Sequence, residues 1–178
     1  MVIYVDVSAA VHGKAGLARY AESLVRALDP LLGERLHLFQ NSLGHRLPLP
    51  GFAPERVAGV PLGYKPWRAQ VLARQALRAP FSALPEAELF HATEHLLPPF
   101  RDTPEVLTVH DLIFERFPQY HKRGNYLYLR AAMPLFCRRA SAIIAISRST
   151  KDDLVSLYHV PEGKIHVIAG CCTNVHSA

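Results

Sequence analysis

The sequence predicts an α/β domain in which a mostly parallel sheet is covered by helices on both of its faces. Short apolar segments rich in β-branched residues alternate with longer segments whose apolar residues recur every three or four positions. This strand–helix–strand alternation is typical of parallel sheets. The length of 178 residues suits one domain, or at most two small ones, and 49% hydrophobic with 20% charged residues is an ordinary globular composition. It excludes disorder, a collagen helix or a coiled coil for the whole chain.

We expect the first strand at residues 2–7, where Val-Ile-Tyr-Val-Asp-Val is rich in β-branched side chains. A helix follows at 16–32, because its apolar residues recur at spacings of three and four and share one face. Pro30 and Gly33 are expected to end this helix. A second strand with alternating apolar residues is expected at 36–39.

The region 41–66 is rich in proline and glycine, which predicts a long irregular segment with one short strand near 57–60. Helical spacing returns at 67–78. Beyond this point the expected strands are 88–91, 106–109, 142–146 and 164–168, and the expected helices are 124–139 and 147–158. Pro134 is expected to kink or break the first of these two helices.

Ligands of parallel sheets bind beyond the carboxyl ends of the strands. This rule singles out the loops at 8–15, 91–99, 110–120 and 147–150, and the segment after 168. Most of the unusual polar residues of the sequence fall in these loops.

The first of these loops carries Gly13 and Gly16 just before a helix. Glycines let a backbone approach a ligand, and a helix N-terminus favours phosphate, although a plain turn explains the same residues. The dinucleotide motif GxGxxG is absent, and the second strand ends in Gln40-Asn41 rather than in an acidic residue. These facts disfavour an NAD-dependent dehydrogenase, and the absence of GxxxxGK[ST] disfavours a P-loop NTPase.

His91, Glu94 and His95 match the zinc-protease pattern HxxEH. That chemistry needs a sustained helix, whereas His91 ends an expected strand and Pro98 and Pro99 follow closely. We therefore expect no metal, and interpret the segment as a strand-end loop whose polar side chains face a cleft.

His110 and Asp111 stand where a buried strand should stop. A histidine beside an aspartate at that edge can bind a polyol, orient a phosphate or exchange a proton, although the backbone alone can also satisfy the histidine. No serine lies in a GxSxG elbow, so a hydrolase triad lacks its nucleophile. Ser147 or Ser149 is expected to cap the helix at the next strand end.

The cysteines and the net charge limit the compartment and the partners that we expect for the chain. Three cysteines (Cys137, Cys171 and Cys172) without CxxC spacing argue against a disulfide framework or a structural zinc site. The N-terminus does not resemble a signal peptide, which favours the cytoplasm. The net charge of +5 favours anionic partners. Aromatic and basic residues alternate near 67–78 and 120–130, which permits contact with a membrane surface, but we expect no nucleic-acid partner.

Four motifs occur in a characteristic order: Gly-Leu-Ala-Arg-Tyr at 16–20, Phe-His-Ala at 90–92, Thr-Val-His-Asp-Leu at 108–112, and Ile-Ala-Ile-Ser at 144–147 followed by Val-Pro-Glu-Gly-Lys-Ile at 160–165. Together they resemble the N-terminal half of the retaining glycosyltransferases of family four, which have the GT-B fold. The resemblance implies a Rossmann-like three-layer α/β/α domain. It also implies transfer of a sugar from a nucleotide-sugar donor to an acceptor hydroxyl, with retention and without a further cofactor.

The resemblance also implies roles for individual residues. Gly13 and Gly16 would lie near the donor diphosphate, His110 would contact the donor sugar, and Asp111 would sit beside it or orient the loop. Arg19 would support the first loop. The residues expected along the acceptor side of the cleft are Arg19, His91, Glu94, His95 and Ser147.

The resemblance divides the chain into an acceptor-side domain at 1–168 and an atypical tail at 169–178. The second domain of such enzymes, which binds most of the donor, has no counterpart in this sequence. We therefore expect the chain to be a truncated half that is inactive by itself, since half a cleft neither excludes water nor holds a pyrophosphate. Its exposed cleft face predicts a homodimer. The first alternative is a stand-alone nucleotide- or anion-binding module without catalysis, and a second is a basic interaction domain for nucleic acid.

Overall fold

The computed structural model describes residues 1–43, 49–84 and 86–169, and within them it confirms the α/β class. The described strands are β1 (Ile3–Asp6), β2 (Leu36–Asn41), β3 (Val57–Val60), β4 (Leu89–Ala92), β5 (Glu105–Val109), β6 (Ala142–Ala145) and β7 (Ile165–Val167). They form one sheet in the order β3-β2-β1-β4-β5-β6-β7, and every neighbouring pair is parallel. The predicted tail at 169–178 lies outside the described residues from position 170 onward.

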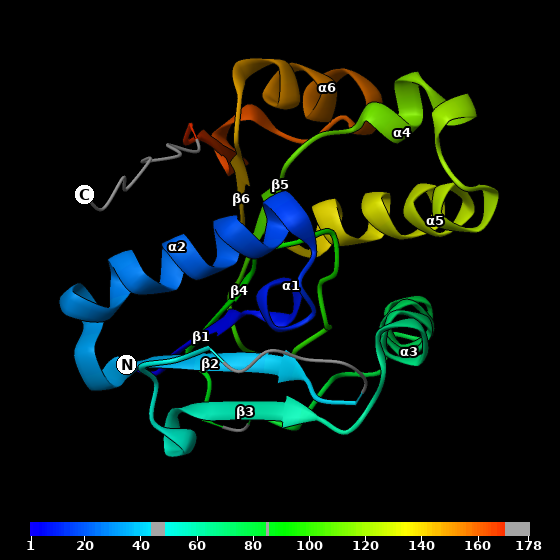
Figure 1. The fold of residues 1–178 in the computed structure, drawn as a ribbon. Helices are drawn as coiled ribbons and strands as arrows, with labels where there is room; N and C mark the ends of the chain where they lie inside the picture. The colour runs from blue at the N-terminus through cyan, green and yellow to red at the C-terminus, as the bar shows by residue number, and fades with distance from the viewer. Residues whose placement is uncertain (44–48, 85, 170–178) are drawn as a thin grey trace.

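The described helices are α1 (Ser8–Val11), α2 (Ala15–Leu32), α3 (Tyr64–Ala76), α4 (Ile113–Arg116), α5 (Arg123–Arg139) and α6 (Arg148–Tyr158), as Figure 1 shows. Single 3-10 turns occur at Gly33–Arg35, Pro54–Arg56, Pro118–Tyr120 and Glu162–Lys164. The long helices and the strands lie close to their predicted positions. The short helices α1 and α4 were not predicted, because one turn is too short to produce a periodic apolar pattern.

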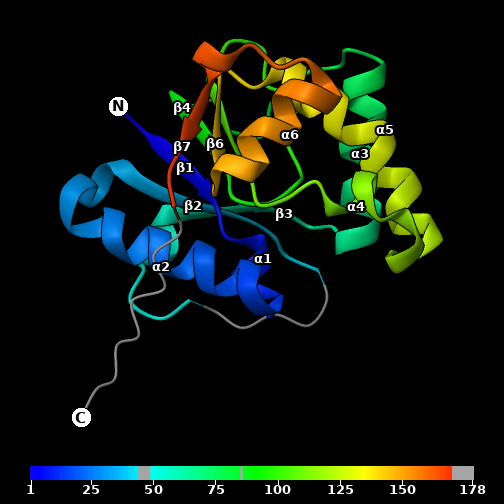
Figure 2. The same cartoon turned by 90° about the horizontal axis from the view of Figure 1, so that it is seen from above.

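Two apolar cores lie on opposite faces of the sheet and make the fold three-layered. Because side chains alternate along a strand, Val5 of β1 packs with α1 and α2. On the other face, Phe90 of β4 packs in the core that includes residues of α3, α5 and α6. Figure 2 shows α1 and α2 on one side of the strands and α3, α5 and α6 on the other. This arrangement confirms the predicted α/β/α architecture.

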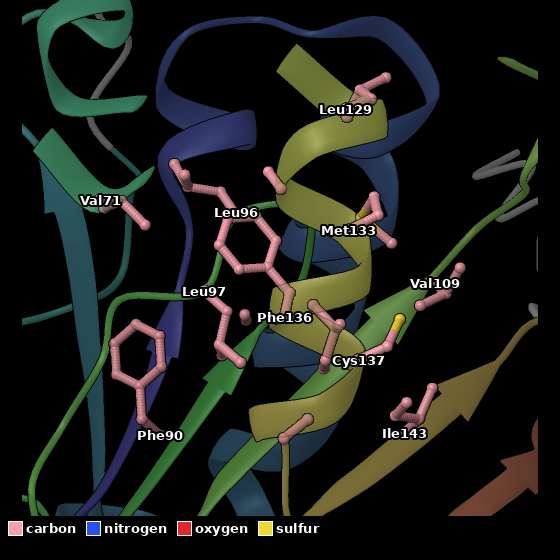
Figure 3. Close-up of a cluster of buried hydrophobic side chains, with 14 of the residues drawn as sticks. Val71, Phe90, Leu96, Leu97, Val109, Leu129, Met133, Phe136, Cys137 and Ile143 are labelled. Carbon is pink, nitrogen blue, oxygen red and sulfur yellow. The ribbon is translucent and has the colours of Figure 1, made fainter. Parts of the chain in front are cut away.

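The larger core is built around α5, as Figure 3 shows. Met133, Phe136 and Cys137 of this helix are fully buried and face β4, β5 and β6. Burial raises the pKa of the Cys137 thiol to about 12, so this cysteine is a packing residue rather than a nucleophile.

Prolines interrupt the helices less than we predicted. Pro134 lies inside α5, which continues across it, and the buried residues on both sides offset the lost backbone hydrogen bond. Pro30 is part of the last turn of α2, which ends at Gly33 with φ +55°. Helix α3 begins at Tyr64 and takes Pro66 into its first turn, where a proline needs no hydrogen-bonding partner for its nitrogen.

Candidate functional site

The loops that carry most of the predicted site residues meet at the carboxyl edge of the sheet. Strand β1 lies between β2 and β4. Strands β2 and β3 therefore extend the sheet on one side of β1, and strands β4 to β7 extend it on the other. This is the point at which the strand order reverses, and in open α/β sheets it is where ligands bind. The loops after β1 and β4 flank this point, and those after β5 and β6 continue along the same edge.

The loop before α2 presents an unpaired backbone donor to open space. Gly13 has φ +64°, which favours glycine, and Ala15 has φ +43°, a strained value for a residue with a side chain. The N–H of Gly16 has no hydrogen-bond acceptor among the described residues, and a Cβ added there would meet nothing within 4 Å. Because the N-terminus of an 18-residue helix carries partial positive charge, this loop can bind an anion.

Lys14, in the same loop, forms a buried ion pair with Glu94 in the loop after β4. Its Nζ lies 3.0 and 2.9 Å from the two carboxylate oxygens, and only 3% of the Glu94 side chain is exposed. The ammonium also lies 3.2 Å from the ring centroid of Tyr64, whose hydroxyl donates to Glu94 at 3.3 Å. Burial lowers the pKa of Lys14 and raises that of Tyr64. Lys14 thus ties the two loops together.

Asp6 is a buried carboxyl group behind this ion pair. Its Oδ1 accepts a hydrogen bond from the Ser8 N–H at 2.8 Å, whereas its Oδ2 has no partner in the part of the chain that the structure describes. Burial, together with the negative charge of Glu94, raises the pKa of Asp6 to about 7. The group is therefore close to half-protonated near neutral pH.

His110 is oriented at the end of β5 by three contacts. Its Nε2–H donates to the Thr93 carbonyl at 2.8 Å, and its backbone N–H donates to Nε2 of His95 at 3.2 Å. The ring of Tyr20, on α2, meets it edge-on with centroids 4.9 Å apart. Since a carbonyl only accepts hydrogen bonds, Nδ1 is the ring atom of His110 that remains for a ligand. Burial, followed by the nearby His110, lowers the pKa of His95 to about 4, so His95 is neutral at pH 7.

Asp111 and Ser147 shape the loops on either side of His110. Asp111 Oδ1 accepts from the Ile113 N–H at 3.1 Å and so initiates α4. Ser147 is the N-cap of α6, and its Oγ accepts from the Thr150 N–H at 3.0 Å, so the cap is Ser147 and not Ser149. The hydroxyl of Thr150 donates to the His110 carbonyl at 3.0 Å and joins α6 to the site.

Two predicted cleft residues make other contacts than we expected. The strand containing His91 continues to Ala92, and His91 is buried with its Nε2 2.8 Å from Oγ1 of Thr108. Burial lowers the pKa of His91 to about 4, so the ring is neutral at pH 7. Arg19 is exposed on α2 and forms no hydrogen bond or ion pair with the described residues of the first loop.

The HxxEH segment lies on β4 and the loop that follows, not on a helix as zinc proteases require. Across residues 1–43, 49–84 and 86–169, no three histidine, cysteine or acidic side chains are grouped as metal ligands would be. Cys171 and Cys172 lie outside this range. Among the described helices, none combines the length and hydrophobicity that a transmembrane span requires.

Sequence reasoning missed Asp6, Lys14 and Tyr64 as parts of the site. Asp6 carried a signal, because it is the one charged residue in an otherwise apolar strand segment. Lys14 stands between the two glycines that were singled out. No sequence signal points to Tyr64, which lies on α3 beyond the long irregular region.

Comparisons with known proteins identify a family and a similar fold. The sequence from 15 to 171 matches a family model described as Glycosyltransferase Family 4. The fold is similar to the crystal structure of Anabaena Alr3699/HepE in complex with UDP, with a TM-score of 0.54 and 16% sequence identity over 94% of this chain. The match covers 43% of that protein, so the chain spans less than half its length. No curated protein matches the sequence significantly.

Proposed function

The chain belongs to glycosyltransferase family 4, and on that premise we propose that it is the acceptor-side lobe of an enzyme that transfers a sugar from a nucleotide-sugar to an acceptor hydroxyl. One observation carries the proposal. Helix α2 presents the unpaired N–H of Gly16 at its N-terminus, and Tyr20, one turn later, contacts His110, whose Nδ1 remains for a ligand. An anion site and a sugar-binding imidazole are thereby joined through one helix.

We propose separate roles for the residues at this edge. The backbone N–H of Gly16 binds the donor diphosphate, Gly13 forms the turn beside it, and Nδ1 of His110 contacts the donor sugar. Asp111 sets the loop after His110, and the ion pair of Lys14 with Glu94 fixes the glycine loop. Ser147 and His95 hold the backbone around His110, the first through Thr150.

In this proposal the donor is a uridine diphosphate sugar, because the similar crystal structure was determined in complex with UDP. Transfer proceeds with retention, by attack on the face that the leaving phosphate vacates, so it needs no protein nucleophile. A second lobe supplies most of the donor contacts, and the chain by itself transfers little sugar because it cannot close around the diphosphate.

Titration of the 178-residue chain with UDP, followed by NMR, tests the anion site. We expect shifts at Gly16 and in the glycine loop, and loss of binding in Gly16→Ala, because the added methyl occupies the space open to a phosphate. The matched control is Gly163→Ala, another exposed glycine whose added Cβ meets nothing within 4 Å. Unchanged UDP binding by Gly16→Ala would contradict the proposal.

The role of His110 is tested in a fusion that adds a nucleotide-sugar-binding second lobe. His110→Ala should lower turnover far more than it lowers the free energy of unfolding, since the ring is only half-buried. Equal turnover would remove His110 from the mechanism. The anomeric configuration of the product, read by NMR, distinguishes retention from inversion.

A further inference from the structure

A groove of about 750 Å³ runs between α3 and α5, and the roles proposed so far do not account for it. Figures 1 and 2 both place these two helices next to each other at one side of the molecule. Ala69, Leu72, Ala73 and Ala76 recur at spacings of three and four, so they form one face of α3 along the groove. Three of these side chains are methyl groups, which leaves the groove open and apolar along its length.

Three cations line the same groove, and none of its lining residues is acidic. Lys65 and Lys122 are exposed, and within the described part of the chain neither takes part in an ion pair. Arg68 donates to Oδ1 of Asn125 at 3.0 Å, and its guanidinium lies 3.7 Å from the ring centroid of Tyr128. These neutral partners orient the guanidinium but do not neutralise it, so the groove attracts an anion.

The cationic end of the groove is continuous with the candidate site. The guanidinium of Arg68 lies 5.3 Å from the ring centroid of Tyr64, and the hydroxyl of Tyr64 donates to Glu94. Glu94 in turn pairs with Lys14 in the glycine loop. A molecule bound in the groove with its anionic group at Arg68 therefore has that group next to the site rather than at a remote surface.

Exposed apolar side chains occur close in the sequence to the part of α5 that lines the groove. Tyr120, in the turn before this helix, is 80% exposed, and Leu127, within it, is 55% exposed. Neither residue lines the groove, so the apolar surface available to a ligand there is the face of α3.

We infer that this groove binds the acceptor, and that the acceptor is an amphiphile carrying a phosphate next to an apolar chain. The phosphate contacts Arg68, Lys65 and Lys122, and the chain lies along the alanine face of α3. We favour an amphiphile over two simpler ligands. Free phosphate would leave the apolar face of α3 without a contact, and an uncharged lipid would leave the three cations without an anion. The role as acceptor site rests on the proposed sugar transfer, whereas the binding itself is measurable without it.

The test is calorimetric titration of the 178-residue chain with monomeric decyl phosphate, compared with inorganic phosphate and with decyl glucoside. We expect only decyl phosphate to bind tightly. The double variant Lys65→Gln with Lys122→Gln should weaken this binding at least tenfold, since hydrogen bonds between charged groups are strong. The control is Arg101→Gln with Arg138→Gln, which removes the same charge from exposed positions outside the groove.

A second pair of variants tests the apolar face. Ala73→Phe fills the groove and should abolish binding, whereas Ala27→Phe, at an exposed position of α2, should leave it unchanged. Circular dichroism establishes that both variants fold.

Three outcomes would overturn the inference: equal binding of decyl glucoside, equal binding of inorganic phosphate, or decyl phosphate binding that the variants in the groove do not weaken. Failure of the proposed function gives a different result. If Gly16→Ala leaves UDP binding unchanged while decyl phosphate still requires Lys65 and Lys122, the lipid-phosphate site stands and its role as acceptor site falls.

Discussion

Replacing Asp6 with asparagine is expected to change how the stability of the domain depends on pH. Burial and the charge of Glu94 raise the pKa of Asp6 from 3.8 to about 7. Between these values the folded chain keeps a proton that the unfolded chain releases, so this group lowers stability as pH rises through the window. At 1.36 kcal/mol for each pKa unit, the shift of roughly three units corresponds to at most about 4 kcal/mol above pH 7.

Two buried histidines act in the opposite direction. Burial lowers the pKa of His91 and of His95 from 6.5 to about 4, so below pH 6.5 the unfolded chain binds protons that the folded chain does not. Their contribution to stability is therefore lost as pH falls from 6.5 to about 4. In the natural sequence, protonation of Asp6 on acidification raises stability and so offsets part of this loss. The Asp6→Asn variant has no such compensating group.

We expect Asp6→Asn to be more stable than the natural sequence near pH 8 and to lose stability more steeply on acidification. The amide oxygen can still accept from Ser8, so the contact at Oδ1 is kept. Urea unfolding followed by the fluorescence of Trp67, the only tryptophan, measures both effects. Asp152→Asn, at an exposed position of α6, is the control. A free-energy difference from the natural sequence that stays constant with pH would refute the reasoning.

Three further variants test the packing that supports the site. Glu94→Gln removes the carboxylate that pairs with Lys14 and leaves only Asp6 as an acidic group beside the ammonium, so it should cost about 3 kcal/mol, whereas Lys14→Met with Glu94→Leu should recover most of the loss in urea unfolding. In Gly59→Ala the added Cβ would clash with the Gln40 carbonyl oxygen, which should push β2 and β3 apart. Amide hydrogen exchange in these two strands should therefore accelerate, and unchanged protection would contradict the close approach of Gly59 to Gln40. Phe136→Ala removes a fully buried ring of Figure 3 and should lower stability by about 3–5 kcal/mol, and a much smaller loss would mean that the core closes around the cavity.

The sequence was sufficient for the fold because its periodic patterns are long. Helix α5 was predicted within one residue of its observed start, and the edge of the sheet was located by the residues that follow each strand. The failures concern single residues at strand ends. We placed His91 at the end of its strand with its side chain toward a cleft, but the strand runs one residue further, and His91 is buried in the sheet against Thr108. The sequence of one strand does not show which residue of the neighbouring strand will cover such a side chain.

The ion pair of Lys14 with Glu94 could not be predicted for a different reason. The two residues are 80 positions apart and meet only because β4 pairs with β1. Local patterns carry no information on strand order, so they do not reveal which loops become neighbours. Tyr64 joins the same cluster from α3, which crosses from β3 to β4 over the face opposite α2.

The ion pair also explains why the glycine loop by itself would bind a donor diphosphate weakly. Lys14 is the cation nearest the glycines in sequence, yet both oxygens of Glu94 engage its ammonium, so it is neutralised from within the lobe. What remains for a diphosphate is the backbone at Gly16 and the dipole of α2, which amounts to roughly half of one positive charge. A diphosphate carries more than one negative charge. Under the proposed function, the missing positive charge must therefore come from groups outside the glycine loop, and the loop contributes position rather than neutralisation.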